Sequence, residues 1–229
     1  MRFLAYFFLV FVTLSIFRQM PVLGGIFRVP LLGFFLAAIV VSTVFARVGE
    51  YLTKRARLQK DIRELGQVDT PRRRGKLGRL LLNNGQAAKA IEPLREALAA
   101  DPENVDWHYR LGSALLKTGE PLDALHSLER ALELNEGFAY GGVLLELSNA
   151  ALAVGDGERA LQCLERHTEL QGDTPEGAYR TGLALKALGR KEEANAAFRA
   201  TTSLIKETPK YQKADAYSWA LRAFWARIF

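Results

Sequence analysis

Few side chains in this sequence have the spacing that catalysis or metal binding requires. The single cysteine, Cys163, excludes an intramolecular disulfide and a cage of thiolate ligands. The three histidines, His108, His126 and His167, fall in separate predicted helices without an acidic ligand motif, and we expect packing or surface roles for them. No nucleophile–base pair or phosphate-binding loop is present, and the glycine-rich stretch 137–142 follows no predicted strand. The sequence therefore predicts neither an enzyme nor a metal or cofactor site.

The charge of the chain changes along its length. The formal net charge of the 229 residues is +6. Residues 1–104 carry sixteen Lys and Arg against eight Asp and Glu, residues 105–174 carry five against twelve, and residues 175–229 carry ten against five. Both ends are basic and the middle is acidic, which argues against the continuous basic face of a nucleic-acid-binding protein. We therefore predict no nucleic-acid partner.

The first 46 residues are almost continuously apolar. Residues 3–17 and 29–46 contain no charge, and the second stretch, extended by Ile26 and Phe27, approaches the ~20 residues that cross a ~30 Å hydrocarbon core. The sequence predicts a membrane anchor over residues 1–46, a hairpin of two transmembrane helices in contact with lipid. A cleaved signal peptide over residues 1–24 is the alternative for the first stretch.

A group of cations follows the second apolar stretch, whereas the loop between the two stretches holds only Arg18 and Arg28. The group consists of Arg47, Lys54, Arg55, Arg57, Lys60 and Arg63. Because cytoplasmic flanks carry the excess of Lys and Arg, residues 47–229 are predicted to lie in the cytoplasm. Residues 47–70 form a basic juxtamembrane helix or linker in this interpretation, since apolar residues recur there at partly helical spacing.

Glycines recur at a nearly constant interval in the rest of the chain. Gly85, Gly119, Gly155 and Gly189 are separated by 34, 36 and 34 residues. Five residues after each glycine comes an alanine, and nine residues after it comes a large apolar residue. Seven residues before each glycine lies a small residue. These columns hold Ala90, Ala124, Ala160 and Ala194, then Leu94, Leu128, Leu164 and Phe198, then Gly78, Gly112, Ser148 and Gly182. Such a pattern predicts stacked repeats, each a pair of helices with a glycine turn between them.

The repeat pattern resembles that of the tetratricopeptide repeat (TPR) family over about residues 71–208. Four units are expected, at 71–104, 105–138, 141–174 and 175–208. The third departs from the family by a two-residue insertion near 137–142 and by His167 at a usually small position, and the fourth by Thr181 and Thr201. The resemblance implies an all-α, right-handed α-solenoid of helix–turn–helix units preceded by the transmembrane helices.

Residues 209–229 are expected to form a capping helix. Ala214, Tyr217, Leu221, Phe224 and Ile228 fall on one predicted helical face, which we expect to close the last repeat. Two further side chains, Trp219 and Trp225, lie off this stripe. They either complete the cap or form a membrane-interface or self-association surface.

The family resemblance also implies which residues line the concave groove, because the first helix of each unit faces it. The corresponding residues are Arg72, Lys76, Arg79, Asn83, Asp106, Tyr109, Arg110, Ser113, Lys117, Glu146, Asn149, Glu176, Tyr179, Arg180 and Lys186. This lining is mainly basic, so we expect a protein or peptide partner with an acidic or C-terminal segment. The carboxylate clamp of the chaperone-binding members is not reproduced, since Gly75 and Arg79 occupy its first two positions.

The resulting functional prediction is a non-catalytic scaffold or adaptor, anchored in a membrane, that binds a partner segment in its groove. The layout resembles that of bacterial inner-membrane TPR proteins, which implies an integral protein of that membrane. One of these, a lipopolysaccharide assembly protein, carries a zinc ribbon that a chain with Cys163 alone cannot form. The alternative is a structural protein that self-assembles into a membrane-bound lattice or homo-oligomer.

Overall fold

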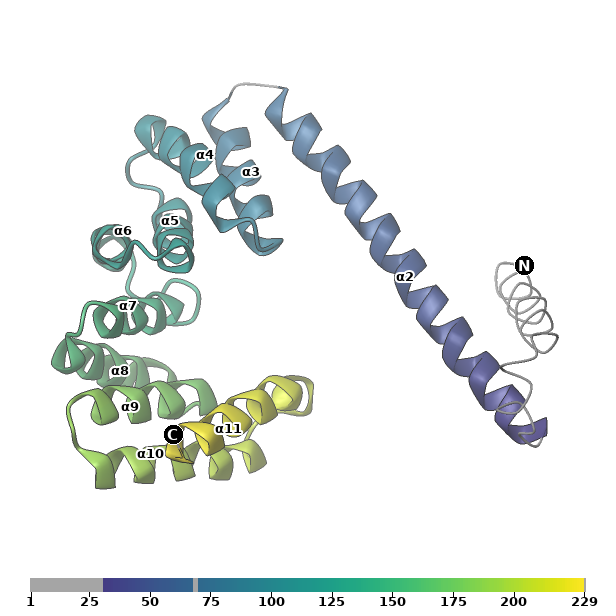
Figure 1. Cartoon of the computed structure of the whole chain (residues 1–229). Coiled ribbons are helices and arrows are strands. Elements are labelled where there is room, and N and C mark those ends of the chain that lie inside the picture. The colour runs from purple at the N-terminus through teal and green to yellow at the C-terminus, as the bar shows by residue number, and fades with distance from the viewer. Residues whose placement is uncertain (1–30, 68–69, 229) are drawn as a thin grey trace. The chain divides into compact units, whose positions relative to one another are not determined.

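The computed structural model describes residues 31–67 and 70–228, and for residues 31–37 the backbone alone. The chain divides into two compact units, Met1–Arg63 and Glu64–Phe229. The described residues form helices joined by short turns, without a strand (Figure 1). This confirms the prediction of an all-helical fold.

One long helix, α2 (Leu31–Gly66), contains the second half of the predicted anchor and the basic segment after it. Several apolar side chains on it are exposed, among them Val44, Val48 and Leu52. Within the described part of the chain, no helix meets the length and apolarity needed to cross a bilayer. The other predicted membrane segment, residues 3–17, lies outside the described residues. The membrane anchor therefore stays a prediction.

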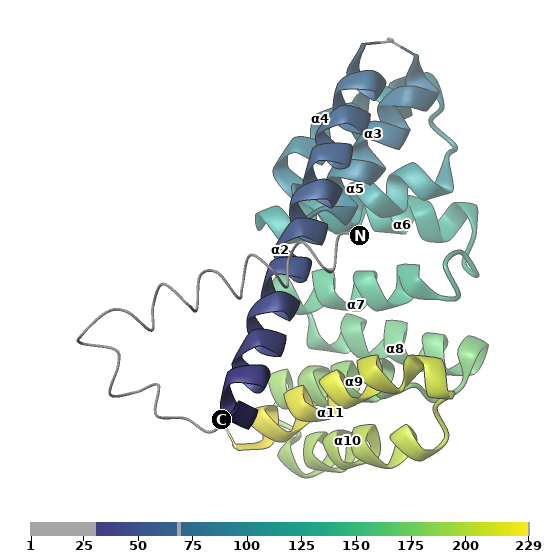
Figure 2. The ribbon, with the colours of Figure 1, turned by 90° about the vertical axis from the view of Figure 1, so that its right-hand side faces the viewer.

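The second unit consists of four helical hairpins stacked in chain order (Figures 1 and 2). They are α3 (Pro71–Asn83) with α4 (Ala87–Ala100), α5 (Val105–Thr118) with α6 (Pro121–Leu134), α7 (Gly142–Ala153) with α8 (Gly157–Gln171), and α9 (Pro175–Ala187) with α10 (Lys191–Ser203). Each helix packs on the next, and the first helices of adjacent hairpins also contact one another. This confirms the predicted TPR-type α-solenoid.

Glycine turns join the two helices of each hairpin. Gly119 follows α5 with φ +85°, a left-handed conformation that a side chain would strain, and the N–H of Glu120 then donates to the carbonyl oxygen of Leu115 at 2.9 Å. The same conformation recurs at Gly85, Gly155 and Gly189. The glycine interval in the sequence therefore marks equivalent corners of the four hairpins.

Small residues let the two helices of a hairpin approach closely. A Cβ atom built at Gly112 would lie only 2.5 Å from Cγ of Leu128, whose side chain is fully buried. The same approach joins Gly78 to Leu94 and Gly182 to Phe198. In these hairpins the small residue of the first helix therefore packs against the large apolar residue of the second helix.

The two-residue insertion before the third hairpin forms an unusual turn. Ala139, Tyr140 and Gly141 all have positive φ, and the Tyr140 side chain is 86% exposed. Beside this turn lies His167, only 2% exposed, and a Cβ at Gly141 would lie 3.0 Å from its Cδ2 atom. Its burial gives His167 the packing role, one of the two roles expected for this histidine, and also lowers the pKa of its imidazole.

After α10 the chain forms two short 3₁₀ helices, η1 (Leu204–Lys206) and η2 (Lys210–Gln212), and then α11 (Lys213–Ile228), which packs on α9 and α10. The predicted packing face of this capping helix is wrong. Ala214, Tyr217, Leu221, Phe224 and Ile228 are exposed, whereas Ala216 and Ala223 are buried against the last hairpin.

The reason is that alanine lets α11 lie close to α9, with one large side chain filling the space between them. The Trp219 ring lies 5.5 Å from the Tyr179 ring, centroid to centroid, and the guanidinium of Arg222 lies 4.4 Å over its face. Trp219 thus completes the cap, as one of the two alternatives proposed, while Trp225 is half exposed.

Candidate binding groove

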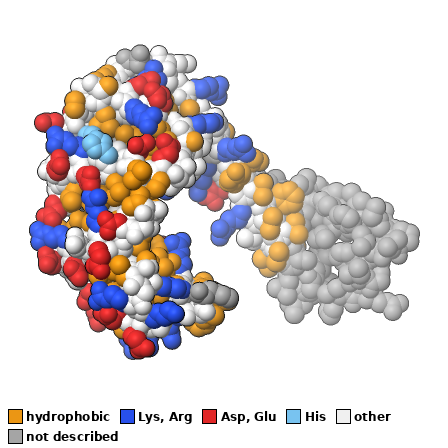
Figure 3. Space-filling model, turned by 60° about the vertical axis from the view of Figure 1, so that its left-hand side comes forward, with side chains coloured by type: hydrophobic (Ala, Val, Ile, Leu, Met, Phe, Trp, Pro, Cys, Tyr) orange, Lys and Arg blue, Asp and Glu red, His pale blue; other side chains and the backbone are white. Residues whose placement is uncertain are grey.

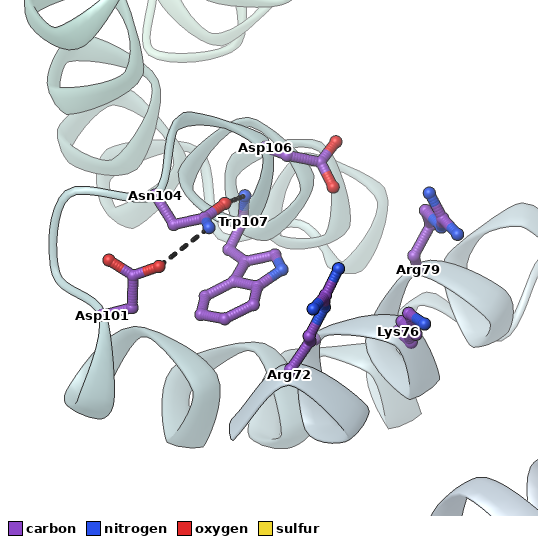
Figure 4. A pocket seen from close by; sticks show the side chains of 8 residues that line it. Arg72, Lys76, Arg79, Asp101, Asn104, Asp106 and Trp107 are labelled. Atoms are coloured by element: carbon purple, nitrogen blue, oxygen red, sulfur yellow. Dashed lines mark hydrogen bonds between the residues drawn. The ribbon is translucent and has the colours of Figure 1, made fainter. Parts of the chain in front are cut away.

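The first part of the candidate site lies between α3 and the start of α5. Arg72, Lys76 and Arg79 project from one side of α3, and Trp107 faces them from α5 (Figure 4). Together with four neighbouring residues they line a hollow of about 460 Å³. The other residues of its lining are Gly75, Asp101, Asn104 and Asp106. We call this hollow the basic pocket.

Trp107 is fixed in place by its neighbours on both sides. Its backbone N–H donates to Oδ1 of Asn104, the residue that caps α5, and Nδ2 of Asn104 donates to Asp101 at 2.9 Å. Its indole occupies the space that a side chain at residue 75 would need, since a Cβ at Gly75 would lie 2.3 Å from the ring. Trp107 is not among the predicted groove residues, although a glycine one repeat earlier on the facing helix is the signal for it.

The positive charge of the basic pocket comes from three side chains of α3. Arg72, Lys76 and Arg79 are exposed, and within the described part of the chain none of them forms an ion pair. Of the two pocket carboxylates, Asp106 accepts from Nε of Arg110 at 2.8 Å and Asp101 accepts from Nδ2 of Asn104 at 2.9 Å. Three cations that neither carboxylate pairs with are suited to bind a negatively charged group.

A second hollow of about 340 Å³ continues along α5 and gathers most of the predicted second-repeat residues. Its lining consists of Leu82, Asn83, Tyr109, Arg110, Ser113, Lys117 and Glu146. The Tyr109 ring packs edge-on against Phe138 with centroids 5.7 Å apart, and burial, followed by the charge of Glu146, raises the pKa of its phenol. We call this hollow the tyrosine pocket.

The predicted groove residues of the later repeats fall into two groups. Asn149 is half-buried on α7 and lines none of the hollows described here. The residues of the fourth repeat contact α11 or neighbouring charged groups, although Lys186 stays exposed and Glu176 lines a further hollow. Lys186 Nζ donates to the carbonyl oxygen of Ala226 at 2.8 Å, and Tyr179 stacks on Trp219.

Arg180 is the most deeply buried of the predicted groove residues, at 6% exposure. Its guanidinium forms ion pairs with Glu176 and, at 3.8 Å, with Glu146, and it also donates to the carbonyl oxygen of Leu145. These contacts tie α9 to α7 and give Arg180 a structural role. The basic pocket and the tyrosine pocket lie on the first two hairpins and α7, and a further hollow of about 750 Å³ lies between α9, η2 and α11.

The charge pattern elsewhere on the repeats is mixed. On the face seen in Figure 3, Lys and Arg side chains alternate with Asp and Glu. Several of these form pairs, such as Arg166 with Glu136 at 2.6 Å and Arg190 with Glu193 at 2.7 Å. Among the described residues, no three His, Cys, Asp or Glu side chains gather as metal ligands would. The basic pocket therefore differs from surfaces on which the charges are already paired.

Comparisons with known proteins identify the family. A family profile described as "Tetratricopeptide repeat" matches residues 76–139 and 145–212, more than half of the chain. The chain therefore belongs to the tetratricopeptide repeat family, whose fold is that of a protein-interaction scaffold. A curated relative, TPR repeat-containing protein PA4299 of Pseudomonas aeruginosa, is 37% identical over 90 residues, which are 39% of this chain and 36% of that protein. This chain thus matches about a third of the length of that relative.

Solved structures confirm the fold alone, because their identity to this chain is below 25%. A MamA protein superposes with a TM-score of 0.60 at 24% identity, covering 76% of this chain and 93% of its own. TTC0263, a thermophilic TPR protein in Thermus thermophilus, superposes with a TM-score of 0.57 at 22% identity, covering 80% and 97%. MamA from Desulfovibrio magneticus RS-1 gives a TM-score of 0.54 at 19% identity, covering 70% and 94%.

Proposed function

We propose that this chain is a membrane-tethered scaffold whose groove binds an acidic segment of a partner protein. The observation that carries the proposal is the basic pocket, in which Arg72, Lys76 and Arg79 face Trp107 without an ion-pair partner among the described residues. Because like charges three and four residues apart on a helix repel one another, an anion bound between these three side chains would stabilise the arrangement.

The two pockets differ in what they offer a peptide. In the basic pocket, guanidinium groups donate paired hydrogen bonds to a carboxylate, and the indole of Trp107 covers an apolar part of the same segment. In the tyrosine pocket, Lys117 supplies a further cation, while Tyr109 and Ser113 supply hydroxyl groups. A segment that crosses both pockets would place its acidic residues over α3 and a polar residue over α5.

Selection of peptides from a displayed random library, followed by measurement of the dissociation constants of the selected peptides, tests this proposal. Selected peptides should be rich in Asp and Glu. The variant Arg72→Glu with Arg79→Glu should weaken their binding at least tenfold, because a hydrogen bond to a charged group contributes about 1.5–3 kcal/mol. The matched control is Lys89→Glu with Arg95→Glu on α4, which makes the same change in net charge at exposed residues outside both pockets. Equal binding by the two variants, or selection of basic peptides, would refute the proposal.

We also propose that residues 1–46 hold the chain in a membrane with the repeats on the cytoplasmic side. The support is the apolar sequence of residues 3–17 and 29–46 and the six cations between Arg47 and Arg63. Full-length protein should stay in the pellet when membranes are washed with alkaline carbonate, and added protease should digest the repeats in inside-out vesicles only. Release by carbonate would show that the apolar segments do not span the bilayer.

A self-assembling structural role is the second candidate, and a specific observation favours it. Five large apolar side chains of α11, among them Leu221 and Phe224, are more than half exposed, as they would be on a surface that binds another copy. Light scattering of the detergent-solubilised protein over a range of concentrations tests this role. A mass that stays that of one chain at every concentration would exclude it.

A further inference from the structure

The exposed side of α11 carries a continuous apolar stripe. Tyr217, Leu221, Phe224, Trp225 and Ile228, which we call the α11 stripe, are between 51% and 60% exposed. Residues 217, 221, 224 and 228 are spaced by four, three and four positions, so they share one side of the helix. A large aromatic side chain can bury roughly 200 Å², so each of the three half-exposed aromatic residues leaves about 100 Å² of its surface accessible. Together they expose about 300 Å² of apolar surface. A patch of this size compares with the largest apolar patch of a typical monomer, which is often a functional surface.

Basic residues border the α11 stripe on both sides. At 100° per residue, Lys213 and Arg227 lie along one edge of the stripe and Arg222 lies along the other. Asp215, the one acidic residue in α11, lies beside Arg222 along that second edge, seven residues before it. Within the described part of the chain, neither Lys213 nor Arg227 forms an ion pair. The edge with Lys213 and Arg227 is therefore positively charged, whereas the edge with Arg222 carries one charge of each sign.

This charge arrangement opposes antiparallel pairing of the stripe with a second copy of itself. In an antiparallel helix pair like edges meet, so Lys213 would lie near the partner's Arg227 and each Arg222 near its counterpart. Like charges beside one another disfavour this arrangement. In a parallel pair the edge with Asp215 and Arg222 would meet the edge with Lys213 and Arg227, which brings together charges of both signs. The complement of the stripe and its basic edge is an apolar surface that carries negative charge.

We propose that α11 lies in the headgroup region of an anionic bilayer, with the α11 stripe against the acyl chains and the edge with Lys213 and Arg227 against lipid phosphates. An interfacial helix combines Trp, Phe and Leu on one side with Lys and Arg at the border, as α11 does along this edge. Tyr217 and Trp225 belong to the residue types that concentrate at this depth. Long cationic side chains such as Arg227 can extend from the apolar surface to the phosphates.

This inference rests on the proposed membrane tether, which brings a bilayer to the chain. It adds a second contact that holds the far end of the repeat array, after the fourth hairpin, at the membrane. Because each cation near an anionic surface contributes about a fivefold increase in affinity, the contact should depend on anionic lipid. It should be much weaker on a bilayer of neutral lipid.

The experiment uses the full chain reconstituted into vesicles, with one nitroxide label per molecule. The native Cys163 is buried and burial raises the pKa of its thiol, so an introduced cysteine takes the label. The probe is placed by Phe224→Cys in the stripe, and the control probe by Leu122→Cys, an exposed apolar residue of α6. Collisions of the nitroxide with oxygen, which concentrates in lipid, and with a polar nickel complex, which stays in water, report the depth of each label.

In vesicles of phosphatidylcholine with about a third phosphatidylglycerol, the label at residue 224 should be reached by oxygen and protected from nickel, and the label at residue 122 should remain in water. In vesicles of phosphatidylcholine alone, the protection of the label at residue 224 from nickel should be at least tenfold smaller than in the vesicles with phosphatidylglycerol. The variant Leu221→Glu should abolish the protection, whereas Leu122→Glu should leave it unchanged.

Three results would overturn the inference. If the protein floats with the vesicles but residue 224 stays in water, the tether exists and the α11 contact does not. If the protein does not float with vesicles of either composition, the tether and the α11 contact both fail. If residue 224 is protected from oxygen and nickel without lipid, protein covers the stripe. Dependence of that protection on protein concentration would then identify the cover as a second copy.

Discussion

Gly112 offers a sharp test of how the hairpins pack, because it has no side chain and the buried side chain of Leu128 packs directly against it. A Cβ at this position would lie 2.5 Å from Cγ and 2.8 Å from Cδ2 of Leu128, and 3.2 Å from the carbonyl oxygen of Ala124. Carbon atoms pack at about 3.5–4.0 Å, so Leu128 would have to move by about 1 Å. Its side chain is fully buried and has no free space to move into.

The expected free energies follow from two opposing effects. Overpacking costs about 1–3 kcal/mol, while replacing glycine by alanine within a helix gains about 1 kcal/mol. We therefore expect Gly112→Ala to destabilise the protein by about 1 kcal/mol. Leu128→Ala should destabilise it by about 3 kcal/mol. In the Leu128→Ala background the clash with Leu128 is gone and the 3.2 Å contact with the carbonyl oxygen of Ala124 remains, so Gly112→Ala should become nearly neutral, with a coupling free energy of about 1 kcal/mol.

Urea unfolding of the four proteins, followed by far-ultraviolet circular dichroism, measures this cycle. Gly66→Ala is the control, since a Cβ there has no neighbour within 4 Å and only helix propensity changes. The same effect of Gly112→Ala in both backgrounds, with a coupling near zero, would refute the proposed contact between the glycine and leucine columns.

Three further predictions concern single residues. Burial lowers the pKa of His167 in the folded protein, so below the ordinary histidine pKa of about 6.5 the unfolded chain binds more protons than the folded one. Thermal melts should therefore show that stability falls as the pH drops through that value. His167→Gln should reduce this fall. Arg180→Met should destabilise the fold by about 3 kcal/mol in urea unfolding, because it leaves the half-buried Glu176 without its partner. The buried Cys163, whose thiol pKa is raised, should react with iodoacetamide much more slowly in the folded chain than in urea, as mass spectrometry would measure.

The sequence predicts the hairpins well because their determinants are local. The glycines at residues 85, 119, 155 and 189 have the left-handed conformation that ends a helix, and the small and large columns meet as Gly112 and Leu128 do. Each of these features depends on residues within a single repeat. The repetition of the feature then makes it visible in the sequence.

The capping helix was harder to predict because side-chain size misleads there. The stripe of Tyr217, Leu221 and Phe224 has the periodicity of a buried face, yet Ala216 and Ala223 form the packing contact. Close approach to α9 requires small residues, and that requirement depends on the neighbouring helix rather than on α11 itself. The role of Trp219 follows from the same docking, whereas that of Arg180 follows from its contacts with α7.

The candidate site was predicted in part. The family positions identify Arg72, Lys76 and Arg79, which the structure brings together in the basic pocket. They omit Trp107, because its position in the groove depends on the missing side chain of Gly75 in the preceding repeat. A rule based on one repeat at a time cannot detect a contact between two repeats.

Photo-crosslinking in native membranes tests the central claim most directly. A photoreactive amino acid is placed at Lys76 in the basic pocket or at Lys89 on α4, which lies outside both pockets, and the adducts are identified by mass spectrometry. We predict a protein adduct at residue 76, joined to an acidic segment of the partner, and none at residue 89. Adducts at residue 89 without any at residue 76, or a basic segment joined at residue 76, would contradict the account.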